Sequence, residues 1–204
     1  MARWTHTVST AAELALLFDS VGAASLHKEV SYVHPSYRAL IEASPFVVLA
    51  TSGPDGLDAS PRGDAPGFVV VEDDKTLLLP DRRGNNRIDS LRNIISDPRV
   101  ALLFLIPGRA ETLRVNGRAT IVTDPQLLER FAVGGKAPKC VLAIEVDTVF
   151  FQCGRAVLRS QLWDSAAAPK LPSAGQILAA LSANAIDGAA YDQALPQRQR
   201  STLY

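Results

Sequence analysis

The segment that decides the fold is residues 80–107, PDRRGNNRIDSLRNIISDPRVALLFLIP. Its first part, residues 81–87, is a polar loop dense in arginine and asparagine. A short amphipathic segment follows, and Asp97-Pro98 ends it. The next run, residues 100–106, is almost wholly apolar. This order predicts a loop, a short helix and a buried strand.

The loop before this helix is a predicted anion site. Unpaired backbone N–H groups at a helix N-terminus, together with the helix dipole, favour negative charge. Arg87 would stand in the first helical turn, where a cation opposes the dipole, and a bound phosphate would reverse that penalty. Asn85 and Asn86 also suit a polar turn and a helix cap, so a solvated helix start remains the alternative.

Short strands separated by turn residues make up most of the remaining sequence. The pattern predicts about seven strands, because apolar and β-branched runs recur at close intervals between turns such as Gly53-Pro54-Asp55-Gly56. Further strands are expected at residues 46–51, 57–62, 68–71, 76–79, 111–122, 141–146 and 149–158. This spacing favours an antiparallel barrel or sandwich over alternating β and α units. Pro61 is expected at an edge or bulge, and Gly117 at a bulge.

Three or four helices are expected at the periphery. Residues 9–22 start with a capping box of Thr10 and Glu13, and further helices are predicted at residues 36–43, 125–131 and 173–183. The chain therefore divides into an N-terminal helical extension (1–43), a β domain (44–163) and a C-terminal helix with a tail (164–204). The sequence assigns no role to the three histidines, all of which lie in the extension: His6, His27 and His34.

Composition limits the function classes. The 204 residues carry 21 basic and 21 acidic side chains, which gives no general signal for nucleic acid or an anionic membrane. No apolar run approaches the length of a membrane span, and the N-terminus does not resemble a signal peptide. Two cysteines without CxxC spacing indicate a cytoplasmic protein with reduced thiols and no metal site, and Cys153 is expected to be buried.

The order of the motifs resembles the pyridoxamine 5′-phosphate oxidase-like, FMN-binding split-barrel family. The resemblance rests on VVLAT, SPRG, RGNNR, DPRVALLF and RVNGRA, which follow one another between residues 47 and 119. Residues 153–163, CGRAVLRSQLW, are similar to one subgroup of FMN-dependent enzymes in that family. The similarity covers residues 44–163. It implies an antiparallel split β-barrel, mainly β with peripheral helices, that forms a homodimer with FMN at the subunit interface.

The resemblance also implies the residues of a cofactor site. In that family, side chains of the second strand and of the loop before the first barrel helix hold the FMN phosphate, and backbone near the end of the fourth strand lies along the flavin. Residues of the C-terminal segment close the site. The corresponding positions here are Ser60, Pro61, Arg62, Pro80, Asp81, Asn85, Asn86, Arg87, Arg159 and Trp163.

The expected function is that of an FMN-dependent oxidoreductase acting on an unknown small molecule, with NADH or NADPH as the candidate electron donor. The chain lacks the Arg-x-His pair that holds the pyridoxal phosphate group in the oxidase, because Ala156-Val157-Leu158 stands in that region. Oxidation of pyridoxamine phosphate is therefore not the expected reaction, and no catalytic acid or base is assigned. The alternatives are a flavin-binding or flavin-sensing protein with little turnover, or a split barrel for haem or a deazaflavin. Haem would want an axial histidine, and residues 44–163 contain none.

Overall fold

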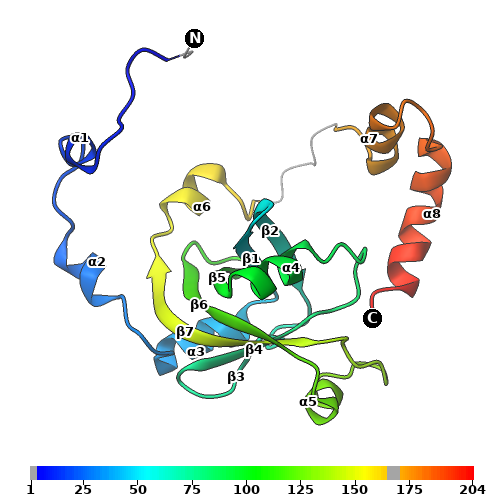
Figure 1. Ribbon diagram of the computed structural model, residues 1–204, viewed down its shortest axis with the longest axis horizontal. Coiled ribbons are helices and arrows are strands. Elements are labelled where there is room, and N and C mark those ends of the chain that lie inside the picture. Colours follow the sequence, from blue (N-terminus) through cyan, green and yellow to red (C-terminus); the bar gives the residue numbers. More distant parts are fainter. Residues whose placement is uncertain (1–3, 165–170) are drawn as a thin grey trace.

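A computed structural model describes residues 4–164 and 171–204. Its centre is a seven-stranded sheet, antiparallel at each strand pair, in the order β2-β1-β5-β6-β7-β4-β3 (Figure 1). The strands are β1 (Phe46–Gly53), β2 (Gly56–Gly63), β3 (Val70–Val71), β4 (Thr76–Pro80), β5 (Arg99–Leu105), β6 (Thr112–Val122) and β7 (Val141–Gln152). The predicted split barrel with peripheral helices is confirmed.

The sheet curls around one hydrophobic core. Val47 and Leu49 of β1 belong to the same buried cluster as Leu77 and Leu79 of β4, although three strands separate β1 from β4 in the sheet. Inward side chains alternate with outward ones along β1 and β5, as expected for strands with one face on a core. Strand β2 is an edge strand, which explains how it accommodates Pro61.

Two helices cover the open sides of the barrel. Helix α3 (Pro35–Ala43) packs against β3, β6 and β7 and buries Ile41, whereas α4 (Asp89–Ser96) packs against β1, β2 and β6 and buries Ile94. The His34 imidazole accepts a hydrogen bond from the Ser36 N–H and caps α3. This contact gives His34 a structural role that the sequence did not indicate.

Helix α4 is fixed to β1 by a buried polar contact. The Asn93 amide donates to the Thr51 hydroxyl at 3.1 Å, and both residues are buried. Gly53 makes room for this contact, because a Cβ atom there would lie 2.1 Å from Asn93 Oδ1. A buried polar pair with specific geometry favours a single placement of the helix. The start of α4 therefore has a defined position beside β2.

The late strands differ in part from the prediction. The expected bulge is confirmed, because the register between β6 and β7 shifts between Asn116 and Gly117. The predicted strands at residues 141–146 and 149–158 form the single strand β7, which ends at Gln152. Residues beyond Gly154 then form α6 (Arg155–Ser160), so the predicted strand end was wrong. Gly154 starts this helix, and a side chain there would meet Ala110. Helix α5 (Pro125–Arg130) agrees with the prediction.

The two ends of the chain contain more, shorter helices than expected. The capping box of Thr10 and Glu13 is confirmed, but its helix α1 covers only Ala11–Ala15, and a second helix, α2 (Ala23–His27), follows it. At the other end, α7 (Ala174–Leu181) is succeeded by α8 (Gly188–Ser201). In the described part of the chain this makes eight helices rather than three or four. The sequence predicted the helix cap at Thr10 correctly, but it did not show where the helix ends.

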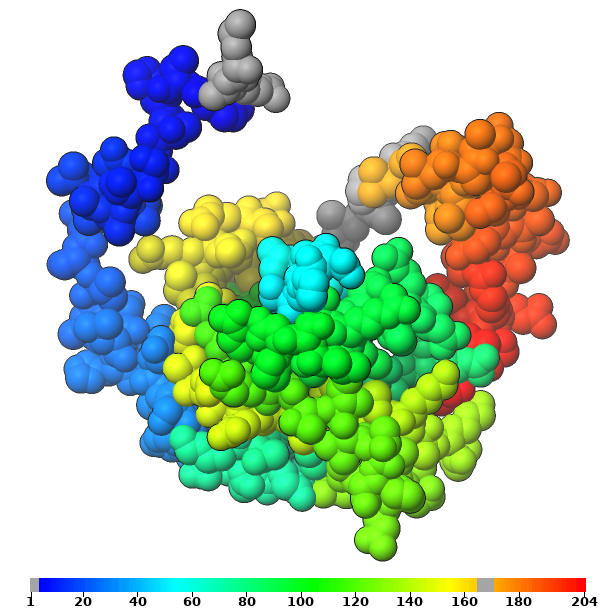
Figure 2. Space-filling view, in the orientation of Figure 1, coloured from blue at the N-terminus to red at the C-terminus, as the bar shows by residue number. Residues whose placement is uncertain are grey.

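Both ends protrude from the barrel. The N-terminal arm and the α7–α8 pair stand off its surface in the space-filling view (Figure 2). The N-terminal arm joins the barrel through a bridge between Val30 and Val149. The division into residues 1–43, 44–163 and 164–204 remains a prediction, and residues 1–3 and 165–170 within it lie outside the described residues. A helix long and apolar enough to cross a membrane is absent from the described residues.

Gly117 tests the role of the bulge. A Cβ atom there would lie 2.2 Å from the Glu145 carbonyl oxygen of the neighbouring strand. We expect Gly117→Ala to lower the free energy of unfolding by about 1–3 kcal/mol, the usual cost of overpacking. Urea denaturation measures this change. Gly22→Ala is the matched control, because a Cβ atom at Gly22 has no neighbour within 4 Å. Equal stability of the two variants would show that the contact between position 117 and the Glu145 carbonyl does not exclude a side chain.

Candidate functional site

A cavity of about 670 Å³ opens at the end of β2, beside the loop that leads into α4. Its size falls within the range of small-molecule sites. The lining comes from the end of β2, the loop after β4, the start of α4, the loop before β7 and the far end of the chain: Pro61, Arg62, Gly63, Asp81, Arg82, Arg83, Gly84, Asn85, Asn86, Arg87, Ile88, Leu91, Lys136, Ala137, Pro138, Lys139, Cys140 and Tyr204.

The charge of this lining is strongly positive. It contains six basic side chains and one carboxylate, that of Asp81. Three of the six have carboxylate partners: Arg62 pairs with Asp81, Arg82 with Asp64 and Arg87 with Asp89. The other three, Arg83, Lys136 and Lys139, have no ion pair among the described residues. Clustered cations that lack matching carboxylates repel one another, and an anion in the cavity would relieve that repulsion. The cavity is therefore suited to an anionic ligand.

Arg62 reaches from β2 toward the loop after β4. Its Nε lies 3.6 Å from Asp81 Oδ1, and its Nη2 lies 3.4 Å from the Ser90 hydroxyl on α4. The Arg62 side chain is largely buried, so less water screens its charge than that of an exposed arginine. These contacts hold the guanidinium at the wall of the cavity and close to the start of α4.

A hydroxyl–carboxylate cluster joins β2 to α4 beneath Arg62. The Ser60 hydroxyl donates to Asp58 Oδ2 at 2.8 Å, and the buried Ser90 hydroxyl donates to the same carboxylate oxygen. The hydrogen bond from Ser90 is the main reason why the pKa of Asp58 is lowered. Ser60, predicted to bind the cofactor, therefore contacts Asp58 in this structure and does not line the cavity.

The loop before α4 turns sharply at Asn86, which has a φ of 59°. The Asn85 side chain accepts a hydrogen bond from the Arg87 N–H at 3.0 Å, and Arg87 Nε lies 2.9 Å from Asp89 Oδ2. Helix α4 begins at Asp89 with Ile88 as its N-cap, so the prediction that Arg87 lies in the first helical turn was wrong. The helix begins without a hydrogen bond from a capping side chain. Its first N–H groups thus lack the partner that a cap supplies, and an anion can take that place.

Asp81 and Cys140 lie on the inner wall of the cavity. Burial raises the pKa of Asp81, although Arg62 and Lys139 act in the opposite direction. Burial, and then the Asp81 carboxylate, raise the pKa of the Cys140 thiol to about 11. The Cys140 thiol therefore stays protonated at neutral pH and is a poor nucleophile. Asp81 is the one carboxylate in this lining that can take up a proton at a higher pH than an ordinary aspartate.

Of the ten predicted site residues, six line the cavity and four do not, Ser60 being one of the four. Pro61, Arg62, Asp81, Asn85, Asn86 and Arg87 meet around the one cavity. Pro80 is buried beside it in the pairing of β4 with β7. The last two predicted residues lie elsewhere in this chain: Arg159 is exposed in the last turn of α6, and the Trp163 indole donates to the Arg109 carbonyl at 2.6 Å. Whether a second subunit brings Arg159 and Trp163 to the site remains a prediction.

Twelve lining residues were not among the predicted site residues, and three of them are polar side chains from distant segments. Lys136 and Lys139 enter from the loop before β7, and Tyr204 enters from beyond α8. The pair Gly134-Gly135, each with a positive φ, allows the turn that precedes these lysines. Two lysines close behind a glycine turn could have indicated a second basic loop at the site. The position of Tyr204 depends on tertiary packing over a long separation in sequence, and no local pattern indicates it.

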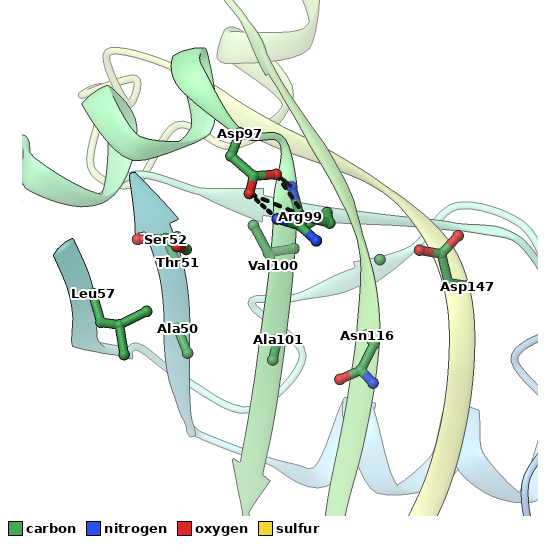
Figure 3. A pocket seen from close by; sticks show the side chains of 11 residues that line it. Ala50, Thr51, Ser52, Leu57, Asp97, Arg99, Val100, Ala101, Asn116 and Asp147 are labelled. Atoms are coloured by element: carbon green, nitrogen blue, oxygen red, sulfur yellow. Dashed lines mark hydrogen bonds and ion pairs between the residues drawn. The ribbon is translucent and has the colours of Figure 1, made fainter. Parts of the chain in front are cut away.

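A second hollow, of about 480 Å³, lies on the outer face of the sheet (Figure 3). Small side chains such as Ala50 on β1 and Ala101 on β5 form its floor, and Asn116 and Asp147 flank it on β6 and β7. At its upper end in the view, Arg99 pairs with Asp97 and lowers the pKa of that carboxyl to about 2. The ten predicted site residues lie outside this hollow.

The fold and the first cavity together define a class: a split-barrel protein with a cavity rich in basic side chains at the start of a barrel helix. Residues 33–153, more than half of the chain, match the family model described as Pyridoxamine 5′-phosphate oxidase. The chain belongs to the pyridoxamine 5′-phosphate oxidase-like family. A comparison with curated proteins gives no match.

Several solved structures are similar to this chain. HupZ of Group A Streptococcus has a TM-score of 0.48 and 23% identity over 59% of this chain and 94% of its own. A protein from Clostridium acetobutylicum related to general stress protein 26, of the pyridoxinephosphate oxidase family, has a TM-score of 0.45 and 15% identity over 58% and 86%. An FMN-binding protein of Syntrophomonas wolfei has a TM-score of 0.44 and 12% identity over 56% and 82%.

The two cysteines provide a test of the cavity wall. Cys140 is buried, whereas Cys153 is exposed, which contradicts the prediction that Cys153 packs in the core. Strand β7 ends at Gln152, so the side chain of Cys153 follows the turn into α6 rather than a strand alternation. We expect a thiol reagent at about pH 8 to modify Cys153 quickly and Cys140 only after unfolding, since the thiolate is the reactive form.

Mass spectrometry of the modified peptides distinguishes the two sites. Cys153→Ser should leave the folded protein nearly unreactive, and Cys140→Ser should leave the rapid reaction intact. Rapid labelling of Cys140 in the folded protein would show that the cavity wall is open to solvent.

Proposed function

We propose that the cavity binds FMN and that the protein is an FMN-dependent oxidoreductase acting on a small molecule. The observation that carries the proposal is the surplus of basic side chains around the uncapped start of α4. The phosphate of FMN is a doubly charged anion near neutral pH, of the kind that helix N-termini and arginines bind well. Membership of this family supports flavin as the aromatic part of the ligand.

The residues present fit such a group. Arg62 and Arg87 both line the cavity and would hold the phosphate, while the first N–H groups of α4 would donate to it. A phosphate there would compete with Asp89 for Arg87, because the two now form an ion pair at 2.9 Å. Once bound, a flavin supplies hydride or single-electron transfer. The contribution of this chain is to position the ring and to exclude water.

The lining offers few groups for proton transfer. Asp81 carries a raised pKa, and the Cys140 thiol stays protonated. No group of three or more histidine, cysteine or acidic side chains that could hold a metal ion occurs among the described residues. We therefore propose a redox reaction in which the chain holds cofactor and substrate and leaves the electron chemistry to the flavin. The substrate is proposed to differ from pyridoxamine phosphate, with NADH or NADPH as the electron donor.

We also propose that the active form is a cytoplasmic homodimer whose two sheets meet through their outer faces. On β1 and β5 this face carries the half-exposed apolar residues Val48, Ala50, Ala101 and Leu103. On β6, Arg114 lies over the Phe150 ring, and within the described residues its Nε is buried without an acceptor. An apolar sheet face with an unsatisfied donor is expected at a protein interface. In such a dimer, a second copy could bring Arg159 and Trp163 to the FMN site.

Flavin binding is the direct test of the proposed function. The purified protein should be yellow or should take up FMN, with quenching of flavin fluorescence on titration. Arg62→Ala and Arg87→Ala should each weaken FMN binding by roughly 1.5–3 kcal/mol, the range for hydrogen bonds to charged groups. Arg92→Ala is the matched control, because Arg92 lies on the same helix near Asp89 but outside the cavity.

Equal affinity in all three variants would remove the start of α4 from the site. A protein that takes up no FMN at all would overturn the proposal itself. Rapid mixing of the FMN-loaded protein with NADH or NADPH separates an oxidoreductase from the second candidate, a flavin-binding protein with little turnover, since a binder should be reduced only slowly.

The proposed interface makes a separate prediction. Ala101→Glu places a charge at the centre of the outer sheet face and should convert a dimer into a monomer in analytical ultracentrifugation, because a buried unpaired charge is costly. Thr120→Glu is the control, since Thr120 is exposed at the far end of β6. An Ala101→Glu protein that sediments as a dimer would exclude this face as the interface.

A further inference from the structure

The α7–α8 pair is a compact unit beside the barrel. Gly175 on α7 and Gly188 on α8 lie so close that a Cβ atom at Gly175 would be 2.0 Å from the Gly188 carbonyl oxygen. Asp192 of α8 accepts hydrogen bonds from the Ser173 hydroxyl and from the Gly175 N–H. These contacts hold α7 and α8 together, and the C-terminus then returns toward the barrel (Figure 1).

Tyr204 makes the contact between this unit and the barrel. Its hydroxyl donates to Asp64 Oδ1 at 2.6 Å, and Lys136 Nζ donates to its main-chain oxygen at 3.1 Å. Its ring lies 5.7 Å from the Arg82 guanidinium. Within the described residues, the two hydrogen bonds made by Tyr204 are those that join the α7–α8 pair to the barrel.

The partners of Tyr204 are well fixed. The Asp64 side chain is almost fully buried and pairs with Arg82, which also donates to the Phe131 carbonyl at 2.6 Å. Burial opposes ionisation of Asp64, but the hydrogen bonds from Tyr204, the Ala65 N–H and Arg82 outweigh it and lower the pKa of the carboxyl. Tyr204 thus docks on a rigid, ionised acceptor rather than on a mobile surface group.

The docked ring forms a wall of the cavity and does not fill it. Tyr204 belongs to the same lining as Arg62 and Arg87, and about 670 Å³ of space remains with Tyr204 in place. Its barrel partners Asp64 and Arg82 already neutralise each other, and docking makes no contact with Arg83 or Lys139, which have no ion pair among the described residues. A ligand and the docked Tyr204 can therefore be present together. Tyr204 would lie over the ligand rather than compete with it for the cavity.

We propose that Tyr204 is a cover for the anion-binding cavity, docked through Asp64, Arg82 and Lys136, which retains the ligand by slowing its release. The proposal rests on the proposed function in taking FMN as that ligand. Ligand sites commonly bury most of the ligand surface, and a tyrosine adds a broad apolar wall with one polar end. Removal of the cover should accelerate dissociation more than association, because a docked wall adds contacts to the bound state.

Three variants test this proposal. Tyr204→Ala removes the ring and the hydroxyl, whereas Tyr204→Phe removes only the hydrogen bond to Asp64. Tyr191→Ala is the matched control, because Tyr191 lies on α8, the helix that precedes Tyr204, contacts Arg198 and is not part of the cavity lining. Stopped-flow fluorescence measures the FMN dissociation rate. We expect about tenfold faster release for Tyr204→Ala, equivalent to about 1.4 kcal/mol, and a smaller increase for Tyr204→Phe. Tyr191→Ala should release FMN at the wild-type rate.

A second measurement needs no flavin. Hydrogen–deuterium exchange of the protein alone should be faster in residues 198–204 and in the cavity loop, residues 82–87, when Tyr204 is alanine. The proposal that Tyr204 covers the cavity would be overturned by unchanged exchange in that loop. It would also be overturned if Tyr204→Ala released FMN at the wild-type rate. If the wild-type protein takes up no FMN, the proposed function fails, and the exchange of residues 82–87 alone decides whether Tyr204 covers the cavity.

Discussion

The contact between the start of α4 and the edge strand β2 determines where an anion can bind. Ser90 donates to Asp58, and Asn93 donates to Thr51, so the helix lies against the barrel with Ile88 and Leu91 in the cavity lining. Arg62 then reaches this helix from β2. Because the helix start has no hydrogen bond from a capping side chain, the fold presents backbone donors and more basic than acidic side chains at one place.

This arrangement links several local features that would otherwise be unrelated. Gly53 lacks a side chain because Asn93 needs the space, and Ser60 contacts Asp58 rather than the cavity because the carboxylate holds both hydroxyls. Asp81 faces Arg62 and is the single carboxylate of the lining. The buried polar contacts thus define the site geometry, while the hydrophobic core closes the barrel that supports it.

The sequence predicted the barrel well because its signals are local. Alternation, turn residues and caps depend on neighbours in the chain, and they located β1, β2, β5 and β6. The end of β7 was missed because α6 follows it within two residues, and an apolar run does not distinguish a strand from a helix. Six of the ten predicted site residues meet at one cavity, but Lys139 and Tyr204 were missed because distant segments bring them there.

A crystal structure of the protein with FMN bound is the most direct measurement of the central claim. The account predicts that the phosphate lies at the start of α4, within hydrogen-bond distance of Arg62 or Arg87 and of the first N–H groups of the helix. A phosphate bound elsewhere, with the loop of residues 81–87 facing bulk water, would contradict the account.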